Sequence, residues 1–98
     1  MSVLGKRLDE ARKRKGLSQE RLGVLAGIDE MSAGARVNQY IKSKHAPDSG
    51  TVERLAAVLE VPVPYLYADD DQMAELLLVF HALDPEARNN LLETLSKR

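Results

Sequence analysis

Side chains that can hydrogen-bond to base edges gather on one face of a short segment near the middle of the 98-residue chain. If Val37, Tyr40 and Ile41 face a core, a rotation of about 100° per helical residue turns the intervening side chains outward. Asn38 and Gln39, which lie on this outward face, each carry the adjacent donor and acceptor that match an adenine edge. The face contains no acid, as a surface close to phosphates requires. Within the segment 33–43, it comprises Ala35, Asn38, Gln39 and Lys42, with Gly34 at the helix start and Arg36 at the flank.

The neighbouring positions suit the other contacts of a helix bound in a DNA groove. Ala35 could touch a thymine methyl group, and Gly34 would let the backbone approach the bases closely. Arg36 could reach a guanine or a phosphate. Basic residues follow the segment, where the duplex backbone would pass, and there they would position the protein without reading sequence. Taken singly, each residue could be ordinary solvated helix surface, but the set together favours DNA. The phosphate candidates after the helix are Lys42, Lys44 and His45.

The distribution of charge supports a cationic surface in the first half of the chain. The net charge is −1, but residues 1–45 carry ten Lys or Arg against five Asp or Glu, a balance of +5. Residues 46–98 carry four bases against ten acids, a balance of −6. Arg7 and the run from Arg12 to Lys15 could raise this potential or interact with their own helix end. The alternative is that both halves simply have charged, solvated faces.

Apolar residues recur at helical spacing along the chain, and no stretch alternates as a strand would. Ser18 is a good N-cap for a second helix, which Gly27 ends. Asp84 followed by Pro85 is a typical helix start, and Asp71 can cap the preceding helix. The chain is therefore predicted to be all-α. The predicted helices span 3–15, 19–26, 33–43, 51–60, 61–68, 72–83 and 85 onward, and their inward stripes include Leu22, Leu25, Met73, Leu76, Leu77 and Phe80.

Three stretches resemble the phage-repressor and Cro-like helix-turn-helix family, also called XRE type. They are GKRLDEARKRKGLSQERLGVLAGI, the proline loop KHAP and TVERLAAVLEVPVPYLYADD, and together they cover about residues 3–68. The resemblance implies a lambda-repressor-like five-helix DNA-binding domain over 1–68, with the second helix across the phosphate backbone and the third in the major groove. The outward face coincides with the family's base-reading positions, and Gln19 matches a position that often touches phosphate. The resemblance implies a sequence-specific transcriptional regulator, expected to be a cytoplasmic repressor of bacterial or phage origin.

The turn before the predicted recognition helix is longer than is usual in that family. Ile28 and the buried aliphatic residue Val37 lie nine positions apart, where five is usual, so the stretch DEMSAG holds four extra residues. Asp29 and Glu30 are acids close to the expected phosphates. We therefore predict that the turn arches away from DNA, with Ser32 capping the next helix. Further departures, at the end of that helix, are Ile41 in place of a glutamate and Ser43 in place of a glycine.

Residues 69–98 extend beyond the resemblance and contain two more predicted helices. Leu78 and Val79 fall outside the inward stripe of the first, so this helix needs a second surface to cover it. We expect a homodimer, because a reader of a palindromic operator gains affinity from two-fold symmetry. The alternative is that both helices pack on the chain's own core. The candidate interface residues are Leu78, Val79, Leu91, Leu92 and Leu95.

Other classes of function find little support in the residues. The chain has no cysteine and only two histidines, His45 and His81, so no metal-binding spacing exists. No nucleophile has a base at plausible reach, and Asp69 to Asp71 are more typical of a solvated cap than of a cation site. We predict no enzyme and no cofactor, and no apolar run is long enough to span a bilayer. The serious alternative is a protein-interaction module, such as an antitoxin-like or bridging factor that keeps the repressor fold.

Overall fold

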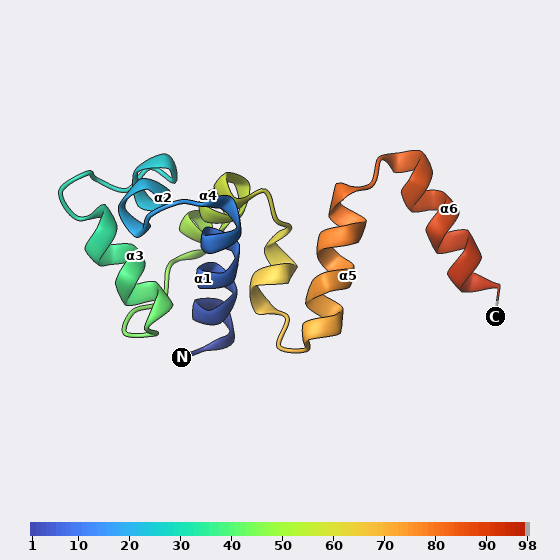
Figure 1. Ribbon diagram of the computed structural model, residues 1–98, viewed down its shortest axis with the longest axis horizontal. Helices are drawn as coiled ribbons and strands as arrows, with labels where there is room; N and C mark the ends of the chain where they lie inside the picture. The colour runs from blue at the N-terminus through green and yellow to red at the C-terminus, as the bar shows by residue number, and fades with distance from the viewer. Residues whose placement is uncertain (98) are drawn as a thin grey trace.

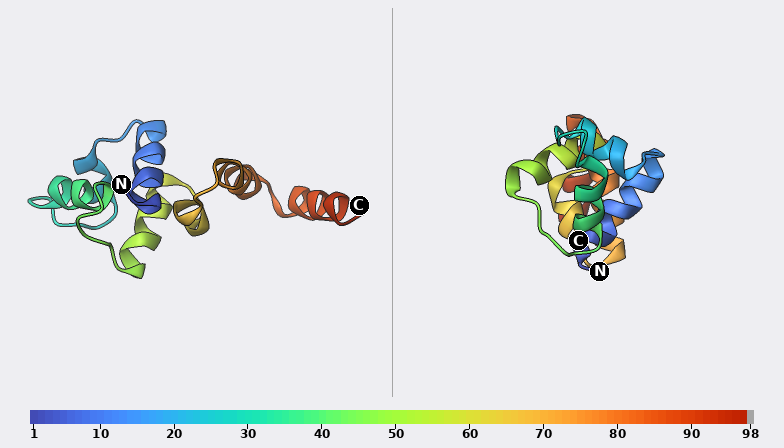
Figure 2. Two further views of the ribbon diagram at one scale, coloured as in Figure 1. Left: turned by 90° about the horizontal axis from the view of Figure 1, so that it is seen from below. Right: turned by 90° about the vertical axis from the view of Figure 1, so that its left-hand side faces the viewer.

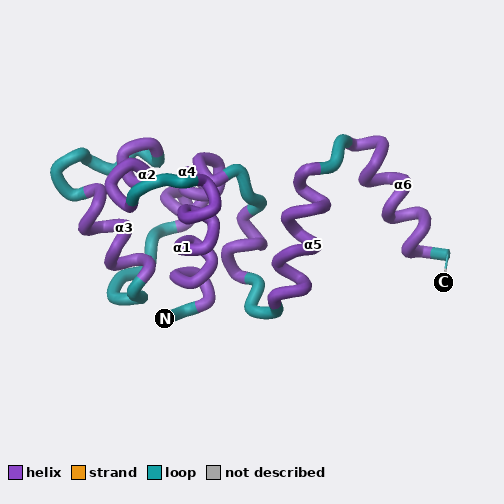
Figure 3. The backbone as a smooth tube through the Cα atoms, in the orientation of Figure 1, coloured by secondary structure: helices purple, strands orange, loops and turns teal. Residues whose placement is uncertain are grey.

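The computed structural model describes residues 1–97, and within that range every regular element is a helix (Figures 1 and 3). Six α-helices and one short 3₁₀-helix follow one another along the chain. The all-α prediction is therefore confirmed, and the first five elements form the five-helix domain. The elements are α1 (Val3–Lys15), α2 (Gln19–Leu25), α3 (Ala33–Ile41), α4 (Ser49–Leu59), η1 (Val63–Tyr67), α5 (Asp71–Ala82) and α6 (Pro85–Ser96).

The core lies between α1, α2, α3, α4 and η1, each of which contributes a fully enclosed side chain. In α3, Val37, Tyr40 and Ile41 are buried, as their spacing predicts. Burying one leucine-sized side chain contributes about 1.5–3 kcal/mol, so this cluster is the main support for the position of α3. The largest enclosed side chains are Tyr65, Leu8, Leu22, Leu55, Leu59, Leu66 and Val37.

Side-chain caps set the start of most helices. Ser18, Asp48 and Asp84 each accept a hydrogen bond from a backbone N–H in the first turn of α2, α4 and α6 respectively. Such a bond satisfies one of the free donors at a helix start and is worth ~1 kcal/mol. Asp70, rather than the predicted Asp71, caps α5, because its carboxylate accepts from two N–H groups of the first turn.

Several expectations about helix bounds and faces differ from the structure, and the fourth helix, for example, begins at Ser49 rather than at residue 51. The third helix ends at Ile41 rather than at residue 43, because Ser43 has already turned to a left-handed φ of 63°. The short fifth helix predicted over 61–68 is present as the 3₁₀-helix η1, but it covers only Val63–Tyr67. Leu25, predicted to face inward, is 45% exposed, because the buried face of α2 carries Leu22 and Gly23 and packs against α3.

The two C-terminal helices pack differently from each other. α5 buries Ala74, with Leu77 and Leu78 also packed against the core. Met73 and Leu76, predicted to face inward, lie instead on the exposed side, because the small Ala74 occupies the buried face of the helix. α6 has no buried residue among those described and extends away from the other helices (Figures 1 and 2).

One arginine fixes the direction of α6. The Nε group of Arg88 donates to the carbonyl oxygen of Phe80, and its Nη2 group donates to that of His81, both at 3.0 Å. The guanidinium carbon of Arg88 lies 5.0 Å from the centroid of the Phe80 ring, a cation–π distance. Both carbonyls belong to the last turn of α5, so a residue of α6 caps the helix before it. The molecule is thus elongated, 51 × 24 × 23 Å, with α3 near one end and α6 at the other (Figure 1).

Candidate nucleic-acid interface

α2 and α3 pack closely because a glycine stands where they meet. A Cβ added at Gly23 would lie 2.8 Å from the Cβ atom of Ala33 and 2.9 Å from its carbonyl oxygen, closer than packed atoms approach. Gly27 adopts a φ of 87° after α2, in the left-handed region that favours glycine. The N–H of Ile28 then donates to the carbonyl oxygen of Gly23 at 2.9 Å. The predicted end of the second helix at Gly27 is confirmed, and the close approach at Gly23 holds α3 at a fixed distance from α2.

The four extra residues lie in an ordered turn between α2 and α3, organised by Asp29. Its carboxylate accepts from the N–H of Met31 at 3.1 Å, and its carbonyl oxygen accepts from the N–H of Ser32 at 3.0 Å. Met31 is 92% exposed, and the loop projects beyond the two helices (Figure 1). Ser32 does not cap α3 as predicted, because its hydroxyl donates to the carbonyl oxygen of Asp29 instead. The turn's course relative to DNA stays a prediction.

The outward face of α3 is the one that its spacing predicts. Ala35 and Arg36 are exposed, while Asn38 and Gln39 are half-buried. The Nδ2 group of Asn38 donates to Oε1 of Gln19 at 3.2 Å, so the start of α2 and the middle of α3 are joined by their amide side chains. The sequence singled out both residues, but sequence reasoning missed this contact between them.

A hollow of about 360 Å³ adjoins this face. Arg36 and Gln39 line it from α3, and His45 lines it from the following loop. The loop is held there because the carbonyl oxygen of Gln39 accepts from the backbone N–H groups of Lys44, at 2.9 Å, and His45, at 3.4 Å. Two base-reading candidates and one phosphate candidate therefore share a single surface.

The end of α3 accommodates a serine where the family has glycine. Ser43 adopts a φ of 63°, a conformation that costs a non-glycine residue about 1–2 kcal/mol. Its Oγ atom accepts a hydrogen bond from the backbone N–H of Ser2 at 2.6 Å, which ties the N-terminus to this turn. Lys42 and Lys44, on either side of Ser43, are exposed. Both phosphate candidates are thus accessible at the end of α3.

Several basic residues of α1 are engaged within the fold. Arg12 donates to Asp9 and to the carbonyl oxygen of Leu17, each at 2.8 Å. The Arg12 hydrogen bond lowers the pKa of Asp9 below its usual range. Lys15 pairs with Glu60 at 2.9 Å. The +5 balance of the first half therefore overstates the charge that α1 offers to a partner.

Arg7 is a buried charge that sequence reasoning missed, since it suggested only a contribution to surface potential. The side chain is 3% exposed, and its Nε group donates to the carbonyl oxygen of Ala68 at 2.7 Å. Its two terminal nitrogens donate to Glu10 and Asp71, each at 3.0 Å. The hydrogen bond from Arg7, and to a smaller extent the one from Lys6, holds the pKa of Asp71 below its usual range. One guanidinium therefore connects α1, the residue after η1 and the start of α5.

Among residues 1–97, no three His, Asp or Glu side chains gather where they could share a metal ion. None of the helices in that range has the length and apolar character needed to cross a membrane.

The chain is similar to known proteins in both sequence and structure. Residues 8–66 match the family model described as Helix-turn-helix. The crystal structure of transcriptional regulator BswR is similar with a TM-score of 0.91 and 46% sequence identity, over 100% of this chain and 95% of that one. No curated protein sequence matches the chain. The range matched by the family model contains α2, α3 and the loop with His45, which together carry the candidate interface.

Proposed function

Because this chain belongs to the helix-turn-helix family of DNA-binding transcriptional regulators, we propose that it acts as a repressor that reads the major groove of double-stranded DNA with α3. The observation that carries this proposal is the acid-free face of α3, with Asn38 and Gln39 at its centre and the exposed Lys42 and Lys44 beyond its end. Side-chain amides read base edges, and lysines neutralise phosphates. α2 would then lie across the duplex backbone.

The contact between Gln19 and Asn38 divides their roles in this proposal. Asn38 uses one amide hydrogen to reach Gln19, which leaves its Oδ1 atom free to accept from an adenine amino group. Gln19 uses Oε1, which leaves its Nε2 group free to donate to a phosphate. The phosphate contact of Gln19 would therefore also orient the base-reading side chain of Asn38. Gly34 and Ala35, at the start of α3, would let the backbone approach the bases.

We further propose that the regulator binds a palindromic operator as a homodimer through residues 69–98. A two-fold dimer presents one α3 to each half-site, so both helices contribute to affinity. Exposed apolar residues on α5 and α6 support this assignment, because monomers rarely leave such surfaces uncovered.

A binding titration of the full chain against random and genome-derived duplexes, at two salt concentrations, tests the function. If the exposed Lys42 and Lys44 of two copies release the counterions of four phosphates, affinity should fall roughly 100-fold between 50 and 200 mM salt. Genome-derived duplexes that contain an operator should also bind more tightly than random duplexes. Absence of salt-dependent DNA binding would overturn the proposal. It would favour the alternative that the chain is a protein-interaction module.

Replacing Gln39 with alanine should reduce discrimination between operator and random duplex by roughly 1–3 kcal/mol, because the variant loses a bidentate contact to a base. The matched control is Gln72→Ala, which removes an exposed glutamine at the start of α5, away from α3. Both variants are compared by titration against the two duplexes. If Gln39→Ala weakens binding to both duplexes equally, Gln39 contacts phosphate instead of a base.

A further inference from the structure

α5 is apolar on two opposite faces. Ala74 faces the core, and because each residue advances by about 100°, Leu76 and Val79 lie near the opposite side of the helix, with Met73 and Phe80 beside them. Of these outward residues, Met73 and Val79 are both 51% exposed, and Leu76 is 45% exposed. We call this face the outer stripe of α5. It comprises Met73, Leu76, Val79 and the half-buried Phe80, which was also predicted to face inward, together with Leu83 directly after the helix.

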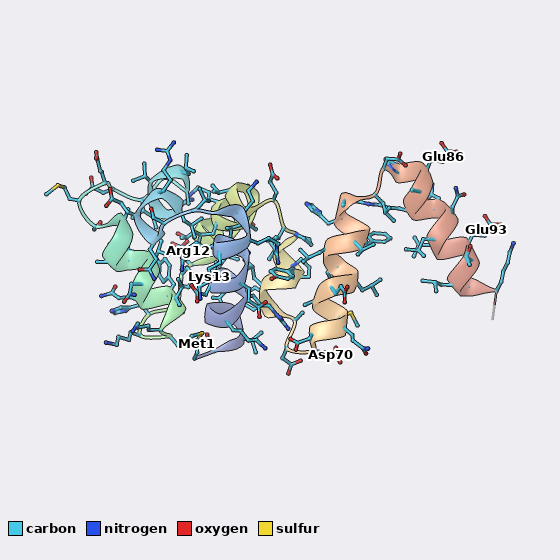
Figure 4. All side chains as sticks on the ribbon, in the orientation of Figure 1. Met1, Arg12, Lys13, Asp70, Glu86 and Glu93 are labelled. Carbon is cyan, nitrogen blue, oxygen red and sulfur yellow. The ribbon has the colours of Figure 1, made fainter. Side chains whose placement is uncertain are left out.

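α6 carries an uncovered apolar face of its own, the α6 stripe, formed by Leu91, Leu92 and Leu95. Leu92 is 50% exposed and Leu95 is 51% exposed, and no residue of α6 is buried. The other side of the helix is acidic, and Figure 4 shows Glu86 and Glu93 on the side that faces away from α5. Only one face of α6 is therefore suited to be covered by a partner.

The chain exposes more surface than its mass explains. Its accessible area is 6332 Å², whereas a compact monomer of 10.9 kDa exposes about 5,600 Å². The excess, roughly 700 Å², is close to the ~800 Å² that each partner buries in an interface of standard size. The radius of gyration, 14.9 Å, likewise exceeds the ~13 Å of a compact chain of this length. The area that a stable dimer needs is thus present.

We propose that each α6 stripe docks on the outer stripe of α5 in a second copy, so that two copies exchange their C-terminal helices around a two-fold axis. This proposal rests on the homodimer of the proposed function and specifies its contact surface. The reciprocal contact covers both stripes of both chains at once. Glu86 and Glu93 remain in water, because they lie on the far side of α6.

Arg88 opposes the alternative in which α6 folds back onto its own α5. α5 ends at Ala82 and α6 begins at Pro85, so only two residues join the helices. Within this short connection, Arg88 holds the carbonyl oxygens of Phe80 and His81 and lies over the Phe80 ring. Folding back would break these contacts, whereas docking on a second copy keeps them.

The first test measures the mass of the full chain in solution by sedimentation equilibrium. We expect a dimer for the native chain and a monomer for L92E/L95E, with the dimer dissociation constant raised at least 100-fold. The variant should keep its helical circular dichroism, because neither leucine is buried. The matched control, E86Q/E93Q, changes the opposite face of α6 and should stay dimeric. A persistent dimer in L92E/L95E would overturn the helix exchange and leave the homodimer standing, whereas a monomeric native chain would overturn both.

The second test uses thiol cross-linking, which is clean because the native chain has no cysteine. Leu76 and Leu92 lie near the middle of the two stripes, so L76C/L92C should be linked between chains into a covalent dimer by a short bis-maleimide. L76C/E93C, with its second cysteine on the opposite face of α6, should link at least tenfold less. Mass spectrometry separates the outcomes. Links within one chain would show that α6 folds back, and a dimer without α5–α6 links would place the interface elsewhere; either result overturns the exchange.

Discussion

Replacing Gly23 with valine is expected to abolish specific DNA binding, because α3 can no longer lie at its present distance from α2. Even a single added Cβ would meet the Cβ and the backbone carbonyl of Ala33 at less than 3.0 Å, and neither atom can swing aside. Overpacking of this kind costs about 1–3 kcal/mol and sometimes more. We expect a loss of about 3 kcal/mol in the free energy of unfolding, and a displaced α3 in the molecules that remain folded.

Controls on neighbouring positions separate this effect from general damage. Leu25→Val introduces the same side chain at an exposed position of α2 and should change stability by less than about 1 kcal/mol. Gly23→Ala provides an intermediate step if the valine variant does not fold. A Cβ at Gly34 would meet Glu20 only at an ordinary 3.5 Å, so Gly34→Ala should keep its stability and lose affinity if bases approach there. Native DNA affinity in Gly23→Val, measured beside urea unfolding, would contradict the prediction.

Replacing Arg7 with methionine should lower the free energy of unfolding by roughly 2–4 kcal/mol, because a buried charge that makes three hydrogen bonds is lost. The carbonyl oxygen of Ala68 loses its 2.7 Å donor, and α5 loses one of its two ionic contacts with α1, because Lys6 still pairs with Asp71. Glu10 and Asp71 are exposed enough to be hydrated in the variant, which keeps the loss below that of a wholly buried pair. Urea unfolding of the full chain measures the effect.

Lys6→Met is the matched control for the arginine, since Lys6 also pairs with Asp71 but its side chain is 49% exposed. It should change stability by less than about 1 kcal/mol. The pKa of Asp71 is lowered in the folded chain, so the ionic part of this network is present above the pKa of an unfolded aspartate. It is lost as the pH falls through the folded value, and the difference between native chain and Arg7→Met should then narrow. Equal losses in the two variants would show that burial of Arg7 is unimportant.

Local signals in the sequence were sufficient to predict most helices. Ser18 and Asp84 cap the helices that they were expected to start, and Gly27 ends α2, because each acts on the backbone within a few residues. Faces were harder to predict. In α5, one apolar stripe begins at Met73 and another begins at Ala74. Periodicity alone cannot decide which of the two stripes packs against the core. That decision depends on how closely α5 and η1 approach.

The candidate interface was predicted residue by residue, but its internal contacts were not. The outward position of Asn38 follows from the burial of Val37 beside it. Its hydrogen bond with Gln19 depends on the separation of two helices, which no sequence spacing encodes. Ser32 was a reasonable cap by type, yet the turn built on Asp29 engages its hydroxyl first. The burial of Arg7 has the same kind of cause, because its three partners lie on three different segments.

The placement of α3 and α6 at opposite ends of the 51 Å molecule has a genetic consequence. In a dimer joined at α6, a chain with a defective α3 would still pair with an intact chain. The mixed dimer would then have only one α3 able to bind the operator. Such an allele would be dominant over the native gene in a cell that expresses both. An allele defective in α6 would be recessive, because its product could not enter a mixed pair.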